Sequence, residues 1–280
     1  MSHIINRSVM ESVCIVCCSN NEQIKNEMLL KSLQGQYLQI TNEEAKEMQL
    51  DICELSLELE IYEKGFSSAA AAYNYAIEHS SSDYFFFVHQ DVAFLDSLFL
   101  LKAVNTINKH KNALFGLCGS KINGNLYTYS NIWHGLWNNN IGTPIDDIVE
   151  VQGLDEVMVA FHKDVTKKIR FDEKTFDGWH LYVEDICLQA ELLSIKVYVL
   201  PYKSQHKSFL EMPGYMKKYG ILPKEYFTYL VRIRNKYKGK VDSIVCPCCC
   251  IRTDFIHFWR QIFFMYKYHR TKEKWRIRSL

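Results

Sequence analysis

Runs of consecutive apolar residues alternate along the chain with stretches in which apolar residues recur every three or four positions. The clearest run is residues 84–88 (YFFFV), which is followed at once by the polar triplet His89, Gln90 and Asp91. Such a run is too short to span a bilayer and is typical of a strand buried on both faces. In an open α/β sheet, ligands bind beyond the carboxyl ends of the strands, so this triplet is a candidate functional position.

The rest of the chain continues the alternation of strand and helix patterns. Further strands are predicted near residues 12–19, 52–61, 113–120, 154–162 and 196–201, and helices within 22–33, 67–79, 95–110 and 176–193. This order predicts an α/β fold with a mostly parallel sheet flanked by helices. Residues 121–152 are rich in Asn, Gly, Trp and Tyr, which favours an irregular or hairpin insertion, a lid or an acceptor-binding region.

Length and charge divide the chain into two parts. A chain of 280 residues can bury a sizeable core, and we expect one large domain at 1–210 with a basic, mainly helical C-terminal extension at 211–280. From residue 214 onward there are 16 Lys and Arg against 4 acids (+12), which leaves 17 against 28 (−11) before it, for a total of +1. The net negative charge of residues 1–213 argues against a nucleic-acid-binding protein. The net positive charge of residues 214–280 favours binding to an anionic surface.

The chain has no apparent membrane or export segment, and its cysteines do not form a disulfide framework. No stretch approaches the ~20 apolar residues of a membrane helix and residues 1–12 lack the apolar core of a signal peptide, so we expect a cytoplasmic protein with reduced thiols. The run CPCCC at 246–250 lacks an obvious second pair of zinc ligands. Cys14 and Cys17 have redox spacing, but a strand would send them to opposite faces.

Four sequence blocks in a fixed order carry a family resemblance. They are YNYAIEHSSSDYFFFVHQD, LDEVMVAFHKDV, FDGWHLYVEDICLQA, and KVYVLP followed by HKS. Over roughly residues 12–210 the chain resembles family 2 glycosyltransferases of the Rossmann-like GT-A fold, in particular the bacterial branch with His-Gln-Asp where others have Asp-x-Asp. The resemblance implies inverting transfer of a sugar from a nucleotide-diphosphate sugar to an acceptor hydroxyl, in surface polysaccharide or glycolipid synthesis.

The resemblance also implies a divalent metal, Mn²⁺ or Mg²⁺, that neutralises the leaving nucleoside diphosphate. Asp91 matches the metal ligand, and His206, after the last strand, matches a position that often supplies another. His89 departs from the more common acidic residue, and imidazole suits Mn²⁺ better than Mg²⁺. The alternative is a polar strand end that makes ordinary turn hydrogen bonds.

Two acids at 184 and 185 are candidates for the catalytic base. Asp185 matches the base of the family, which would take a proton from the acceptor hydroxyl. On a helix the side chains of Glu184 and Asp185 point about 100° apart, so only one of them can accept the proton of the acceptor hydroxyl. The alternative is that both acids complement the positive end of a helix dipole.

The remaining candidate residues follow from the resemblance. Donor-binding positions are Cys18, Asn20, Glu22, Asn74, His89, Gln90 and Asp91, and acceptor or substrate positions are Asp155, Gly178, Trp179 and His180. Each also has an ordinary interpretation, as a helix cap, a packing residue or a charge at a strand edge.

The C-terminal tail predicts an amphipathic basic helix. Phe255, Phe258, Trp259, Ile262, Phe263 and Tyr266 fall at helical spacing, and from residue 255 onward seven Lys and Arg face one acid. The helix either docks on the domain or attaches to an anionic membrane through residues 252–280, where a lipid-linked or other glycan acceptor would lie. A catalytically inactive relative that binds nucleotide sugar or glycan as a scaffold or sensor is the second functional hypothesis. A nucleotidyltransferase would need a Gly-rich phosphate loop after the first strand, which CCSNNEQ does not provide.

Overall fold

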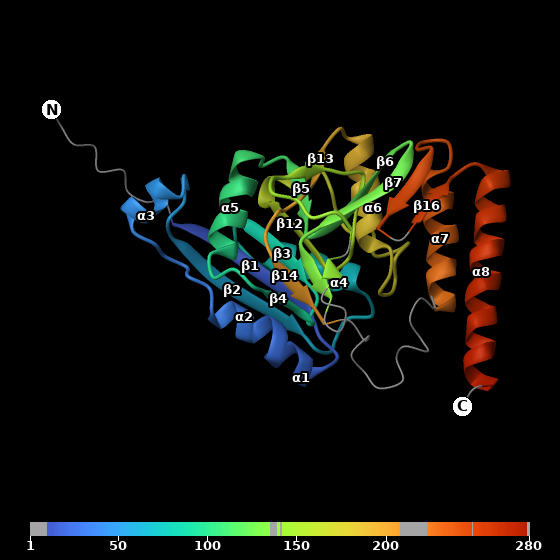
Figure 1. Ribbon diagram of the computed structural model, residues 1–280, viewed down its shortest axis with the longest axis horizontal. Helices are drawn as coiled ribbons and strands as arrows, with labels where there is room; N and C mark the ends of the chain where they lie inside the picture. The colour runs from blue at the N-terminus through green and yellow to red at the C-terminus, as the bar shows by residue number, and fades with distance from the viewer. Residues whose placement is uncertain (1–9, 135–138, 141, 208–222, 248, 279–280) are drawn as a thin grey trace.

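The computed structural model describes residues 10–134, 139–140, 142–207, 223–247 and 249–278. Its centre is a seven-stranded sheet with the order β10-β13-β5-β12-β3-β1-β2 (Figure 1). The bounds are β1 (Glu11–Cys18), β2 (Leu55–Tyr62), β3 (Tyr84–Val88), β5 (Ala113–Gly116), β10 (Val149–Glu150), β12 (Met158–His162) and β13 (Lys196–Val199). Strands β2, β1, β3, β5 and β13 run in one direction, whereas β12 and β10 run against it. The predicted α/β fold with a mostly parallel sheet is confirmed.

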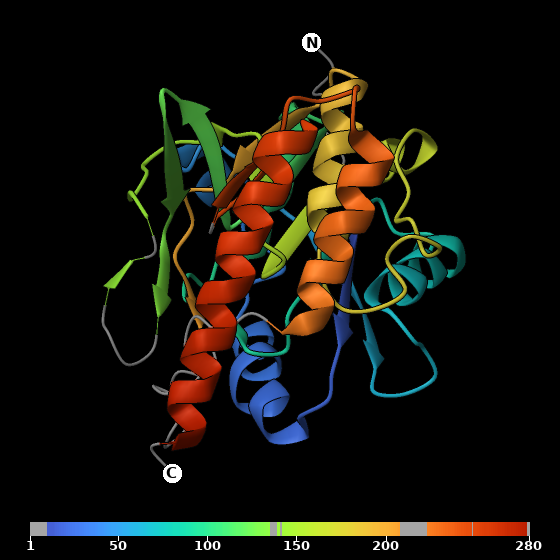
Figure 2. The same cartoon turned by 90° about the vertical axis from the view of Figure 1, so that its right-hand side faces the viewer.

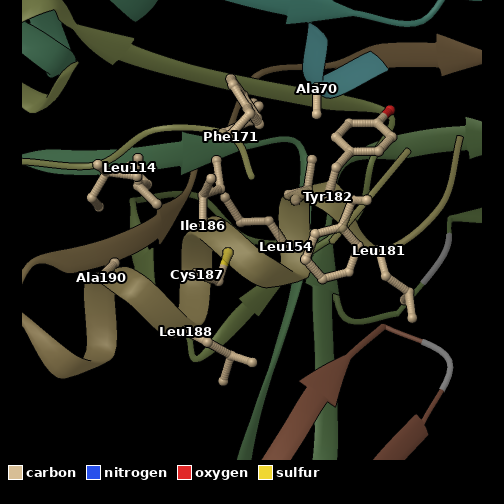
Figure 3. Packing of buried hydrophobic residues seen from close by; sticks show 14 of the residues in the cluster. Ala70, Leu114, Leu154, Phe171, Leu181, Tyr182, Ile186, Cys187, Leu188 and Ala190 are labelled. Carbon is tan, nitrogen blue, oxygen red and sulfur yellow. The ribbon is translucent and has the colours of Figure 1, made fainter. Parts of the chain in front are cut away.

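Helices cover both faces of this sheet. Their bounds are α1 (Glu22–Lys25), the π-helical η1 (Asn26–Leu30), α2 (Lys31–Gln34), α3 (Asn42–Glu47), α4 (Ala69–His79), α5 (Phe99–Lys109), the 3₁₀ helix η3 (Lys163–Lys167), α6 (Tyr182–Leu192), α7 (Lys224–Tyr237) and α8 (Phe255–Arg278). Apolar residues of α4, α6, α7 and α8 form one buried cluster, shown around α6 in Figure 3, and those of η1, α2 and α5 belong to another. Along β1 and β3, successive side chains point in turn to one buried cluster and then to the other. Both strands are therefore buried on both faces, as their apolar runs predict.

Local signals explain where the N-terminal helices begin. Segments α1, η1 and α2 follow one another over residues 22–34 and correspond to the helix predicted at 22–33, with Asn21 as the N-cap that accepts from Ile24 N. Helix α3 was not among the predicted elements. Its signal is a capping box in which the Thr41 hydroxyl accepts from Glu44 N and the Glu44 carboxylate accepts from Thr41 N.

Two small sheets are built largely from the predicted insertion. One has the order β11-β6-β7, with β6 (Cys118–Asn123), β7 (Asn125–Ser130) and β11 (Gly153–Leu154). The other has the order β4-β14-β8-β9, with β4 (Val92–Phe94), β8 (Ile132–His134), β9 (Asn139–Asn140) and β14 (Ser204–His206). The β6–β7 hairpin confirms the hairpin predicted within residues 121–152, of which 135–138 and 141 lie outside the described residues.

The C-terminal extension packs on the face of the sheet that α6 covers. It contains α7, the hairpin of β15 (Ser243–Cys246) and β16 (Cys249–Arg252), and α8, which lies on the outer side of α7 in Figures 1 and 2. Leu230 and Ile233 of α7 and Phe258 and Ile262 of α8 belong to the same buried cluster as α6. Within the described part of the chain, no helix combines the length and the apolar character needed to cross a membrane.

Candidate active site

A short antiparallel ladder brings His206 next to Asp91. Strand β3 ends at Val88, the polar triplet follows, and β4 begins at Val92. Strand β14 pairs with β4 so that His206 lies opposite Val92, and the backbone N–H of Lys207 donates to the Asp91 carbonyl at 2.8 Å. As a result His206 Nε2 lies 3.3 Å from Asp91 Oδ1, although the two residues are far apart in sequence.

His89, Asp91 and His206 form a group that we call the metal triad. Each offers one ligand atom, and these atoms all lie within 4.8 Å of one another. A Tyr182 hydroxyl lies 3.2 Å from His89 Nε2 and holds that ring in place. Two imidazoles and one carboxylate fit a divalent transition metal such as Mn²⁺ better than they fit the all-oxygen preference of Mg²⁺.

Burial and mutual charge set the protonation of the triad. Burial raises the pKa of the Asp91 carboxyl, but the adjacent His206 outweighs this and holds that pKa below its ordinary value. Burial lowers the pKa of His206, but the Asp91 carboxylate outweighs this and raises it above its ordinary value. Burial lowers the pKa of His89 and favours the neutral imidazole, which is the form that binds metals.

A pocket of about 350 Å³ opens beside the metal triad, beyond the carboxyl ends of β1, β2 and β3. The described residues that line it are Cys18, Ser19, Asn20, Tyr62, Glu63, Lys64, Phe66, Tyr73, His89, Gln90, Asp91, Trp179 and Tyr182. Because β2 and β3 flank β1 on opposite sides, this is a topological switch point of the sheet. Its volume and its mixture of aromatic and polar side chains suit a small organic ligand with an anionic group near the triad.

Gln90, the central residue of the triplet, holds the loop after β1. Its Oε1 accepts from Ser19 Oγ at 2.9 Å, from Asn20 N at 3.0 Å and from Asn21 N at 2.9 Å. Its Nε2 donates to Asn20 Oδ1 at 2.6 Å. A carboxylate here could accept the same three bonds but could not donate the fourth, so the amide ties the wall of the pocket to the strand end that carries the metal triad.

Replacing Gln90 with alanine is expected to loosen this loop and leave the fold intact. Three donors lose their acceptor, and at about 1 kcal/mol for each hydrogen bond the amides of Asn20 and Asn21 should exchange with deuterated solvent at least about tenfold faster. Hydrogen-exchange mass spectrometry of residues 19–25 measures this effect. Gln23→Ala is the matched control, because the exposed Gln23 side chain bonds Glu27 on the same helical stretch and no other side chain in the described part of the structure. Equal exchange in both variants would contradict the role of Gln90.

Six of the residues predicted for donor and acceptor binding line the pocket: Cys18, Asn20, His89, Gln90, Asp91 and Trp179. Among the described lining residues Glu22, Asn74, Asp155, Gly178 and His180 do not occur. Asn74 is buried and binds Phe171 and Glu173, so it joins α4 to the loop before α6.

The loop that carries Trp179 owes its path to Gly178. A Cβ at Gly178 would lie 2.2 Å from the Tyr229 hydroxyl, so a larger residue here would have to displace the Tyr229 side chain of α7. The adjacent Trp179 is 48 % exposed at the pocket, and the ring of His180 packs edge to face on Tyr226. Gly178 therefore packs closely against α7, next to the partly exposed Trp179.

Tyr62, Glu63, Lys64, Phe66 and Tyr182 line the pocket and were missed from the sequence. Tyr62 is the last residue of β2 and residues 63 and 64 directly follow it, as residues 89–91 follow β3. Ligands bind beyond the carboxyl ends of strands, which is the reason that His89 and Asp91 were predicted, and the same reasoning applies to residues 62–64. Gly65 indicates where the chain turns after this strand. The predicted strand, placed at 52–61, ended one residue before the observed end of β2.

The two candidate bases on α6 lie in the interior. Asp185 is 0 % exposed, and its carboxylate accepts from Lys236 Nζ at 2.7 Å, Tyr237 OH at 2.8 Å and Gln189 Nε2 at 2.8 Å. Glu184 is 5 % exposed, and neither residue is among the described residues that line the pocket. The expectation that Asp185 stands open at the pocket therefore differs from the structure, because α7 covers it. Here Asp185 joins α6 to α7.

Comparisons with known proteins agree with this architecture. The model of a family described as "Glycosyltransferase like family" matches residues 14–212. A comparison with curated proteins gives no match. The crystal structure of TarS from S. aureus superposes with a TM-score of 0.51 at 14 % identity over 83 % of this chain and 40 % of that one. The structure of GalNAc-T7 with UDP, GalNAc and Mn²⁺ superposes with a TM-score of 0.51 at 11 % identity over 81 % of this chain and 51 % of that one. The chain thus spans about half the length of these proteins or less, and the predicted GT-A fold is confirmed.

Proposed function

Because this chain belongs to the glycosyltransferase-like family, we propose that it transfers a sugar from a nucleotide-diphosphate sugar to an acceptor hydroxyl with inversion at the anomeric carbon, in the synthesis of a surface polysaccharide or glycolipid. The observation that supports this most directly is that His89 and Asp91 belong both to the metal triad and to the wall of the 350 Å³ pocket. A nucleotide sugar requires such a pair of features, since its nucleoside and sugar need a cavity and its diphosphate needs a cation. GalNAc-T7, which shares the fold, was crystallised with UDP, GalNAc and Mn²⁺.

The triad residues would hold the metal, and we propose Mn²⁺ rather than Mg²⁺ from their two imidazoles. A divalent cation bound there supplies positive charge for the diphosphate as the sugar leaves. The neutral His89 and the ionised Asp91 are the forms that bind a metal at neutral pH. The loop held by Gln90 forms the side of the pocket where the nucleoside would lie.

We assign the acceptor side to Asp155 rather than to Asp185. Asp155 is half-buried, directly follows β11 and accepts a hydrogen bond from Val157 N at 3.0 Å. The backbone N–H of His89 donates to the Val157 carbonyl at 3.0 Å, so the turn that begins at Asp155 lies next to the metal triad, and the Asp155 charge acts to raise the pKa of both His89 and His206. Neither Asp155 nor Asp185 is among the described residues that line the pocket, but Asp155 is partly exposed whereas Asp185 is completely buried and holds three hydrogen bonds, so Asp155 is the better placed of the two to accept the proton of an acceptor hydroxyl.

Turnover of defined donors tests the proposed reaction. UDP-, GDP- and dTDP-sugars are incubated with the protein and Mn²⁺, with a bacterial lipid extract as the source of acceptors, and release of nucleoside diphosphate is measured. Asp155→Asn should lower kcat about 100-fold, whereas Asp185→Asn should lower it less than tenfold for the folded fraction. A donor that raises the melting temperature without turnover would identify the inactive relative instead. Absence of both stabilisation and turnover with every donor would contradict the proposal.

We further propose that α8 attaches the protein to an anionic membrane, with residues 1–210 as the catalytic part and 211–280 as the attachment. Phe258 and Ile262 are buried, whereas Ile256 is 74 %, Phe255 69 % and Phe263 61 % exposed. These exposed apolar side chains lie on the outermost helix in Figure 2, whose residues 255–278 include seven Lys and Arg and one acid. Aromatic residues combined with flanking cations suit the headgroup region of an anionic bilayer.

Sedimentation with lipid vesicles tests the attachment. The protein should bind vesicles of phosphatidylcholine and phosphatidylglycerol more tightly than vesicles of phosphatidylcholine alone, and added salt should weaken the difference. Ile256→Ser combined with Phe263→Ser should reduce binding at least about tenfold, because two side chains that would enter the bilayer are removed. Tyr37→Ser, at a side chain of similar exposure (61 %) that precedes α3, is the control. Equal binding to both kinds of vesicle would contradict the proposal.

A further inference from the structure

The hairpin of β15 and β16 brings two thiols together. Cys246, the last residue of β15, pairs with Cys249, the first residue of β16, so the two lie opposite each other on neighbouring strands. Their sulfur atoms are 3.1 Å apart, and the Cys246 thiol also lies 3.3 Å from the Cys249 carbonyl oxygen. Neither sulfur is part of a disulfide in the structure. The two side chains therefore already have the proximity that a disulfide between paired strands requires.

Contacts outside the hairpin hold this arrangement in place. The Thr128 hydroxyl of β7 donates to the Pro247 carbonyl at 3.2 Å, directly at the turn between the two cysteines. Gly153 of β11 packs so closely on β15 that a Cβ there would lie 1.9 Å from the Val245 carbonyl oxygen. The Tyr226 hydroxyl of α7 lies 3.9 Å from the Cys246 sulfur. Because three separate elements fix the hairpin, little further ordering is needed to bring the two sulfurs together.

The two thiols differ in access. Cys246 is 2 % exposed, whereas Cys249 is partly exposed. The other pair with the same spacing, Cys14 and Cys17, is buried in two clusters on opposite faces of the sheet, and burial raises the pKa of Cys14 to about 12. The hairpin pair thus combines proximity with access from solvent, which the strand pair lacks.

We propose that Cys246 and Cys249 form a reversible dithiol–disulfide site whose oxidant is a small-molecule disulfide. The Cys249 thiolate attacks one sulfur of that disulfide, which releases one small thiol and leaves a mixed disulfide on Cys249. The Cys246 thiolate then attacks the Cys249 sulfur, forms the protein disulfide and releases the second small thiol. Two protein thiols are oxidised, one small disulfide is reduced to two thiols, and the two protons lost by the cysteines are taken up by the departing thiolates.

The site lies where it can control how firmly α8 is held. Helix α8 begins shortly after β16 ends, and the Gln261 side chain of α8 binds Arg252 N at 3.0 Å and the Cys250 carbonyl at 3.1 Å. Closing the disulfide joins the ends of the two strands at the turn and restricts local opening of the hairpin on which α8 rests. This inference does not depend on the proposed sugar transfer or on membrane attachment.

Thiol mapping on the full chain tests the site. The protein is treated with oxidised glutathione, free thiols are blocked with N-ethylmaleimide, and the tryptic peptide of residues 241–252 is sequenced by tandem mass spectrometry. We expect a disulfide between Cys246 and Cys249, its reversal by dithiothreitol, and amide exchange of residues 243–252 that is at least about tenfold slower in the oxidised protein. Cys250→Ser is the matched control and should form the same disulfide. No disulfide, or one that joins other cysteines, would overturn the proposal.

A second experiment tests whether Cys249 reacts before Cys246. In Cys246→Ser the second step is blocked, so glutathione should accumulate on Cys249 as a mixed disulfide, and circular dichroism checks that this variant is folded. A glutathione adduct on a cysteine other than Cys249 in the folded variant would contradict the proposed order. If the variant does not fold, the mapping on the unmodified chain still decides whether the site exists.

Discussion

Replacing Asp91 with asparagine is expected to reduce sugar transfer about 1,000-fold or more and to abolish tight binding of Mn²⁺. Asparagine keeps the size of the side chain and the backbone hydrogen bond from Lys207 N, but it removes the anionic oxygen that lies 3.3 Å from His206 Nε2. Stabilisation of a leaving diphosphate by a bound cation is worth several kcal/mol, and about 4 kcal/mol corresponds to this factor. Initial rates with saturating donor and titration with Mn²⁺ in the absence of donor measure the two effects separately.

A matched control shows whether the effect comes from the loss of the Asp91 carboxylate or from the loss of any negative charge. Asp146→Asn makes the same chemical change at an exposed position in the segment between β9 and β10, and it should leave both rate and metal binding unchanged. Asp91→Asn should also retain the melting temperature of the metal-free protein to within a few degrees, because the β4–β14 ladder is built from backbone groups and His206 can lose its proton once the carboxylate is removed. Full activity in a folded Asp91→Asn protein would remove the basis for the metal triad.

The metal triad could be predicted because it depends on strand ends, which leave a clear mark in the sequence. An apolar run of five residues places His89 and Asp91 just beyond a buried strand, and the family resemblance adds His206. The pairing of β14 with β4 that brings His206 close to Asp91 leaves no comparable mark, since each strand has only three residues. Similarly, the apolar run of β12 predicts a buried strand but not its reversed direction, because side chains buried on both faces look alike in either orientation.

The surroundings of Asp185 could not be predicted for a different reason. Helical periodicity correctly places Asp185 on α6 and shows which residues share its face, but it does not show which other element covers that face. The covering element is α7, and its Lys236 and Tyr237 belong to the segment that the sequence assigns to a separate extension. Charge counts treat Lys236 as one of many cations in a basic tail, although it is in fact the partner of a fully buried carboxylate.

Replacing Lys236 with methionine is expected to lower the free energy of unfolding by about 3 kcal/mol, which corresponds to a melting temperature roughly 5–10 °C lower. The Lys236 ammonium donates to Asp185 at 2.7 Å and to Asp172 at 2.7 Å, and it is only 26 % exposed. Methionine retains most of the apolar stem but leaves the fully buried Asp185 carboxylate with only neutral donors. The loss should fall at the lower end of the range for broken buried pairs, because Tyr237 and Gln189 still donate. Chemical denaturation measures it.

The pH dependence of this loss gives a sharper test than its size. Burial raises the pKa of Asp185, and Lys236 and Tyr237 offset only part of this. Without Lys236 that pKa rises further, so the native state binds a proton that the unfolded state, with a carboxyl pKa of about 3.9, has already released. The stability of Lys236→Met should therefore fall as the pH rises from about 4 towards the raised pKa, and its deficit relative to the unmodified protein should be larger at pH 8 than at pH 5.

A second variant shows whether the buried charge is the cause. Adding Asp185→Asn to Lys236→Met removes the carboxylate that has lost its partner, so the double variant should recover part of the lost stability and lose the extra dependence on pH. Lys238→Met removes an exposed lysine directly after α7 and should change the melting temperature by less than about 1 °C. A deficit in Lys236→Met that is equal at pH 5 and pH 8 and unchanged in the double variant would mean that lost packing, not the Asp185 charge, holds α6 against α7.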